Sequence, residues 1–123
     1  MGATLIFPAA TTLLAIAFVS GLVMAFIRFG SDRQSPSWMP KMHGFAAVAA
    51  LSLLLFGWAH AEYSRAASSA VLLLLIAAAG GVFLNLNYHG KQVPLPEWLV
   101  FAHMSVAFVG FLMVFLVLIS RAA

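Results

Sequence analysis

Four long apolar stretches, none with a charged residue in its middle, most constrain what this chain can fold into. They run over residues 5–29, 38–59, 66–88 and 98–120. Each is close to the ~20 residues that an α-helix needs to cross ~30 Å of hydrocarbon. Because backbone groups in lipid must find hydrogen-bond partners within their own segment, each stretch is predicted to be a transmembrane helix.

The composition agrees with a chain that has the bilayer as its solvent. Apolar residues make up 64% of the 123 residues and charged residues 7%, whereas a soluble domain has about half and about a quarter. The chain has no cysteine, which excludes disulfides, thiolate metal sites and iron–sulfur clusters of its own. Its six basic residues are too dispersed to predict a nucleic-acid partner.

The connections between the apolar stretches are short, and this predicts the topology. Short loops make sequential helices antiparallel neighbours. We therefore expect an all-α, integral membrane, four-helix up-down bundle that forms one transmembrane domain over residues 1–123. The lipid bilayer is its first partner.

The distribution of basic residues predicts the orientation. The side with loops 30–37 and 89–97 has four basic residues, which are Arg28, Arg33, Lys41 and Lys91. The side with both termini has two, which are Arg65 and Arg121. Lys and Arg are in excess on the cytoplasmic side of membrane proteins. We expect those two loops in the cytoplasm and both termini outside it, with the bacterial inner membrane as the location.

The sequence matches itself at an offset of sixty residues without a gap. Matches between Leu or Ala are common in so apolar a chain, but scarce residue types match as well. These are Gly21 with Gly81, Gly30 with Gly90, Pro36 with Pro96, Trp38 with Trp98, and His43 with His103. We interpret residues 1–60 and 61–123 as two tandem helical hairpins, related by a pseudo-two-fold axis along the membrane normal.

The repeat places two histidines at equal depth. His43 and His103 fall on the second and fourth helices, which occupy diagonal corners of an up-down bundle. Each lies seven residues after a proline, which is ~10 Å below the start of its helix. Gly21 and Gly81 should lie at about the same depth on the other two helices.

His43 and His103 are therefore the candidate metal ligands. Haem iron takes axial ligands on opposite faces, and ionisable residues at membrane depth are functional candidates. We expect one haem b near one membrane face, with Gly21 and Gly81 leaving room for the macrocycle edge. Four further residues are expected to pair with or cover the propionates on the loop side: Arg28, Trp38, Lys41 and Trp98.

Other interpretations stay open at this point. A histidine near a helix end can be interfacial or bond a neighbouring helix, and glycine can simply permit close packing. Thioether and imidazole side chains that cluster near one membrane face would suit copper or zinc. These are Met39, Met42, His43, His89, His103 and Met104. Another tetrapyrrole could replace haem. The chain could also be a non-redox structural or assembly subunit of a larger membrane complex.

Four membrane helices with a histidine pair inside them resemble the membrane cytochromes b, in the broad cytochrome b561-like sense. In that group a four-helix core holds haem b between helical histidines and exchanges electrons with quinone or superoxide. The resemblance covers the bundle and the pair His43 and His103 only. This chain departs from two-haem members because it offers one symmetric pair, so electron transfer across the membrane is not implied.

The resemblance implies an electron-transfer protein or an oxidoreductase subunit rather than a free-standing enzyme. Quinone and other membrane or peripheral subunits would be its partners. The sequence has no nucleophile–base pairing and no glycine-rich phosphate loop. Its only carboxylates are Asp32, Glu62 and Glu97, all in loops or at helix ends. Hydrolytic and transferase chemistry is therefore not predicted.

Overall fold

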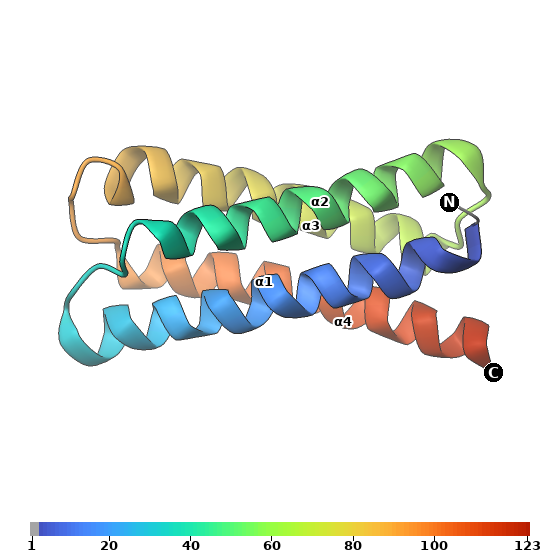
Figure 1. Cartoon of the computed structure of the whole chain (residues 1–123), viewed down its shortest axis with the longest axis horizontal. Helices are drawn as coiled ribbons and strands as arrows, with labels where there is room; N and C mark the ends of the chain where they lie inside the picture. Colours follow the sequence, from blue (N-terminus) through green and yellow to red (C-terminus); the bar gives the residue numbers. More distant parts are fainter. Residues whose placement is uncertain (1–2) are drawn as a thin grey trace.

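The computed structural model describes residues 3–123, which form a bundle of four antiparallel helices (Figure 1). The helices are α1 (Ala3–Ser31), α2 (Trp38–His60), α3 (Arg65–Leu84) and α4 (Glu97–Ala122). A short π-helix, η1 (Asn85–His89), continues α3. The predicted all-α up-down bundle is confirmed, and the helix limits differ from the expected ones by only a few residues.

Each helix, with η1 counted as part of α3, is long and apolar enough to cross a membrane. The mean hydropathy of the most apolar window is between 1.7 and 2.5 in the four helices. Between 17% and 33% of each such window is buried inside the bundle. The remaining apolar surface faces outwards, which is compatible with an integral membrane protein in a lipid bilayer.

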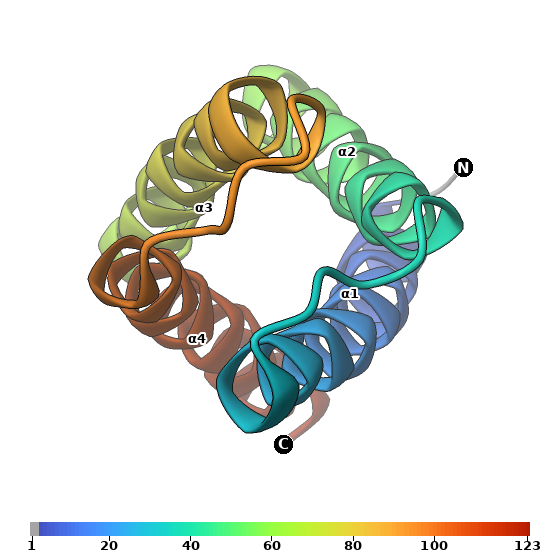
Figure 2. The same ribbon diagram turned by 90° about the vertical axis from the view of Figure 1, so that its left-hand side faces the viewer.

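The four helices lie at the corners of a square (Figure 2). In this arrangement α2 is diagonal to α4, and α1 is diagonal to α3. Both chain ends and the loop 61–64 lie at one end of the bundle, while the loops 32–37 and 90–96 lie at the other (Figure 1). The histidine-bearing helices are therefore diagonal partners, as the repeat predicts.

The packed core occupies the half of the bundle nearest the chain ends. Its fully buried residues come from the first half of α1 and α3 and the second half of α2 and α4: they include Ala10, Ala50, Leu54, Ala70, Val71 and Val114. A smaller cluster of Ala25, Leu84 and Val100 lies near the other end. The two clusters leave the middle of the loop-side half without a packed centre.

The chain-end side is closed by Tyr63 in the loop 61–64. Its ring packs against Phe7, with the ring centroids 5.2 Å apart. The Arg121 guanidinium lies over the Phe7 ring at 4.2 Å. Burial raises the pKa of the Tyr63 phenol, and the charge of Arg121 lowers it in part.

The helices of each hairpin approach closely where one of them carries a small residue. A Cβ atom added to Gly110 on α4 would lie 2.9 Å from Cγ of Leu74 on α3. Real Cβ atoms do not approach other atoms so closely, so the backbones of α3 and α4 would have to separate. The close approach within this hairpin therefore depends on the missing side chain.

We expect Gly110→Ala to destabilise the bundle by about 1–3 kcal/mol through overpacking. Gly44→Ala is the matched control, because a Cβ there meets nothing within 4 Å among the described residues. That control should gain up to about 1 kcal/mol from helix propensity. Thermal unfolding in detergent, followed by circular dichroism, measures both. Equal stability of the two variants would contradict the packing described here.

Candidate functional site

A cavity of about 330 Å³ lies inside the loop-side half of the bundle, with walls from all four helices. Most of the lining side chains are apolar. The polar ones are few: Arg28, Gln34, His43, Asn85, His89 and His103 are the main members. A mainly apolar cavity with a few convergent polar groups is the usual form of a small-molecule or cofactor site.

His43 and His103 meet in this cavity from diagonal helices. Their ring centroids are 6.2 Å apart, and the ring planes are inclined by 72°. Two imidazoles bound to one metal through bonds of about 2 Å place their ring centres about 6 Å apart, on opposite sides of the metal. The observed spacing of the ring centroids is close to this value.

The His43 ring is held by the helix it packs against. Its Nδ1 lies 2.7 Å from the carbonyl oxygen of Ala17 on α1. A carbonyl oxygen can only accept, so Nδ1 carries the proton and Nε2 keeps a free lone pair. The Ser20 hydroxyl lies 3.5 Å from the same Nδ1. Metal-binding histidines are typically fixed in this way by their second nitrogen.

The His103 ring occupies the equivalent place in the second hairpin, but it is held less firmly. The equivalent carbonyl is that of Ala77, which lies near the ring. Within residues 3–123, however, the buried Nδ1 of His103 has no hydrogen-bond partner. Gly80 stands where the first hairpin has Ser20. The two histidines are thus matched in position and unequal in support.

Gly21 and Gly81 make room for the imidazoles themselves. A Cβ on Gly21 would lie 2.9 Å from Cε1 of His43, and one on Gly81 would lie 3.1 Å from Cε1 of His103. Both glycines line the cavity as expected. The space they leave, however, is taken by the histidine of the same hairpin, whereas the sequence analysis assigned it to the edge of a macrocycle.

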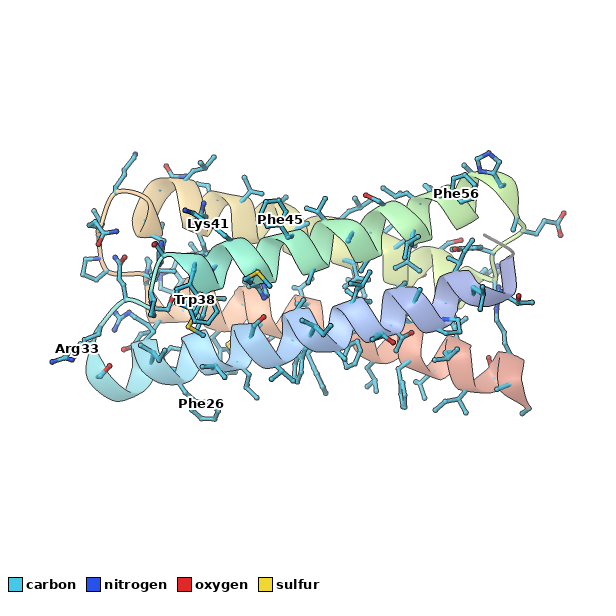
Figure 3. The ribbon with its side chains drawn as sticks, viewed as in Figure 1. Phe26, Arg33, Trp38, Lys41, Phe45 and Phe56 are labelled. Carbon is cyan, nitrogen blue, oxygen red and sulfur yellow. The ribbon has the colours of Figure 1, made fainter. Side chains whose placement is uncertain are left out.

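Trp38, Lys41 and Trp98 do not line the cavity. The side chains of Trp38 and Trp98 are 62% and 72% exposed, and Lys41 projects from the outer side of α2 (Figure 3). Helical geometry is the reason: a residue five positions before a histidine points ~140° away from it around the helix, and one two positions before points ~160° away. The structure places these three residues on the outer surface.

Arg28 lines the loop-side end of the cavity and is largely buried, with its side chain 13% exposed. Its Nε donates to the carbonyl of Leu95 at 2.9 Å. Its Nη1 pairs with Asp32 at 2.6 Å, and Glu97 lies 3.8 Å away. Arg28 thereby ties α1 to the start of α4. The spacing of Asp32 four residues after Arg28 was visible in the sequence, but the contacts with Leu95 and Glu97 were not.

Five polar residues line the cavity that the haem interpretation did not include: Arg33, Gln34, Ser35, Asn85 and His89, of which His89 belonged to the copper or zinc interpretation only. His89 is only 8% exposed, and its Nε2 donates to the carbonyl of Ser35 at 3.1 Å. Gln34 donates to the carbonyl of Val93 at 2.6 Å. Both bonds join the loops of the two hairpins. The only signal for them in the sequence was a run of polar residues at the end of an apolar helix.

Of the six groups of the copper or zinc interpretation, four line the cavity and two do not: His43, His89, His103 and Met104 against Met39 and Met42. Within residues 3–123 no three His, Asp or Glu side chains lie close enough to hold a metal ion. Met42 is 56% exposed on the outside of α2, and neither Met42 nor Met39 lines the cavity. His60 lies at the far end of the bundle, exposed and bonded to the carbonyl of Phe56.

Similarity to known proteins does not assign a function to this cavity. No protein-family model, no curated protein and no solved structure matches the chain. The functional conclusion therefore depends on the cavity and on the histidine pair inside it.

We expect the free protein to hold His43 as the Nδ1-protonated tautomer, because the Ala17 carbonyl accepts from Nδ1. Gly21→Ala should abolish this preference, since the added methyl group displaces the ring. Gly30→Ala is the control, because a Cβ there meets nothing within 4 Å in the described chain. Nitrogen-15 NMR of histidine-labelled protein distinguishes the tautomers. An Nε2-protonated His43 in the wild type would contradict the assignment.

Proposed function

We propose that the chain is a membrane b-type cytochrome, or a cytochrome-like subunit, that holds one haem between His43 and His103. The observation that carries this proposal is the pair of imidazoles facing one another from diagonal helices, with ring centroids 6.2 Å apart. That spacing suits two axial ligands on one iron. A haem bound there would supply one-electron redox chemistry.

The chain's own residues suit that role in three ways. The Ala17 carbonyl leaves the Nε2 lone pair of His43 free for a metal. Gly21 and Gly81 let both imidazoles sit close to the neighbouring helices. The mainly apolar lining excludes water, which favours the binding of an apolar macrocycle.

Arg28 and Gln34 are two of the polar residues at the loop-side end of the cavity, together with Arg33, Ser35 and His89. A cofactor with acidic groups would place them at this end, where a guanidinium and an amide are present. Arg28 is already paired with Asp32, so it offers a partly neutralised charge. Of the four residues first assigned to the propionates, only Arg28 remains in this proposal.

The position of the site favours a relay at one membrane surface. The histidines lie near the loop-side face, which leaves ~20 Å of hydrocarbon to the opposite face of a ~30 Å core. A single haem there would pass electrons to or from quinone or a partner subunit. We place the protein in the bacterial inner membrane, with loops 30–37 and 89–97 cytoplasmic and both termini on the other side.

We expect purified protein to show Soret and α bands in its reduced-minus-oxidised spectrum, with about one haem per chain. Replacing both His43 and His103 by Ala should remove the bands, because the iron would lose both axial ligands. His60→Ala is the matched control: it also removes a helical imidazole, but from the exposed far end, and it should leave the spectrum unchanged.

Helical circular dichroism of the double variant checks that it remains folded. A colourless wild type, or bands that survive the double replacement, would refute the haem proposal. A colourless protein without bound metal would favour a structural or assembly subunit. Copper or zinc found by elemental analysis would favour metal handling.

A further inference from the structure

The two seams between the hairpins are equivalent in the repeat but differ in structure. A two-fold relation between hairpins maps the contact between α1 and α4 onto the contact between α3 and α2. Yet α1 and α4 approach one another at more positions than α2 and α3 do. The residue sizes differ accordingly. The α1–α4 seam has large side chains, which are Phe18, Met104, Phe108 and Phe111. At the equivalent positions, in the same order, the α2–α3 seam has the smaller Ala78, Gly44, Val48 and Leu51.

Large side chains fill the α1–α4 seam. The Phe18 ring lies 5.7 Å from that of Phe108 and 5.6 Å from that of Phe111. Met104 packs against the smaller buried cluster nearby. The bond from Arg28 to the Leu95 carbonyl adds a polar tie near the loop end of this seam. The cavity therefore has a closed wall on this side.

The α2–α3 seam leaves the cavity open towards the lipid. Val48, Val82 and Leu86 line the cavity and are nevertheless 59%, 56% and 61% exposed. We interpret these residues as the rim of a lateral opening. Gly44 also lines it, and a Cβ there would meet nothing within 4 Å in the described part of the chain. Gly44 therefore leaves space at the position that the Met104 side chain fills in the α1–α4 seam.

Asn85 stands at this rim without a partner. Its side chain lines the cavity and is exposed, and it forms no hydrogen bond within residues 3–123, whereas the Asn87 amide donates to the Phe83 carbonyl. The equivalent residue in the first hairpin is the buried Ala25. Asn85 begins the π-helix η1, a feature that is frequent at functional sites. An amide without a hydrogen-bond partner is costly in an apolar environment, so a ligand that accepts from it is favoured.

We infer that the α2–α3 seam is a lateral opening that binds the headgroup of a lipid-soluble quinone from the bilayer. The Asn85 amide donates to a quinone carbonyl, and Gly44, Val48 and Val82 contact the ring. This inference extends the proposed function, because it selects quinone as the exchange partner of the histidine site. The binding itself does not require haem.

The chemistry of the opening favours a quinone over other occupants. A quinone combines a flat apolar ring with carbonyl acceptors, which matches an apolar rim with one amide donor. A lipid acyl chain would leave Asn85 unpaired. A water-soluble partner would have to reach the cavity through the loop end, where Arg33 lines the cavity and is exposed. There His89 and Gln34 tie the loops to one another, and Arg28 ties α1 to the segment before α4.

Photo-crosslinking of the intact protein in nanodiscs, with an azido derivative of a short-chain ubiquinone, tests this inference. We expect labelling on residues 40–51 and 78–89, competed by unlabelled decylubiquinone. Val48→Phe gives the α2–α3 seam the residue that stands at Phe108 in the other seam, and it should reduce labelling at least five-fold. Asn85→Ala should weaken competition by decylubiquinone by a similar factor.

Val23→Phe is the matched control. The substitution is the same, but Val23 lies on the lipid-facing side of α1 and does not line the cavity. The equivalent residue in the second hairpin, Phe83, is already a phenylalanine. Val23→Phe should leave labelling unchanged. Labelling that is scattered over the lipid face, or equal at both seams, overturns the inference. The haem content, measured separately, distinguishes this failure from failure of the cytochrome proposal.

Discussion

An imidazole inside a membrane needs both space and a hydrogen-bond acceptor, and the loop-side half of this bundle is arranged around that need. Gly21 and Gly81 provide the space on the helices that face His43 and His103. The Ala17 carbonyl provides the acceptor for His43. Because these groups come from the partner helix of each hairpin, every hairpin positions its own histidine. Bringing two such hairpins together then sets the two rings opposite one another across the cavity, with their planes inclined by 72°.

The bundle separates its packed core from its cavity along its length. Fully buried Ala10, Leu54 and Val114 pack the half near the chain ends, where apolar side chains of complementary size meet. The loop-side half has a cavity instead of a continuous core, and its walls are held at the end by Arg28, Gln34 and His89.

The differences between the two hairpins explain how a cavity with a matched histidine pair opens laterally at one seam. The elements that position the histidines recur at the same spacing, as Gly21 with His43 and Gly81 with His103 show. The residues between the hairpins do not recur in size. Phe18, Met104 and Phe108 close one seam, while their counterparts Ala78, Gly44 and Val48 leave the other open. The cavity is therefore symmetric in its histidines and asymmetric in its access.

The sequence by itself determined the four helices, their alternating directions and the diagonal placement of His43 and His103, because helix length, loop length and a sixty-residue repeat are local or periodic properties. It did not determine which way side chains point near helix ends. Trp38, Lys41 and Trp98 shared the expected depth but face outwards, since rotation around a helix decides that. Only the tertiary structure brought Asn85 and His89 to the cavity and opened one seam, because those outcomes depend on how large and small side chains from different helices meet.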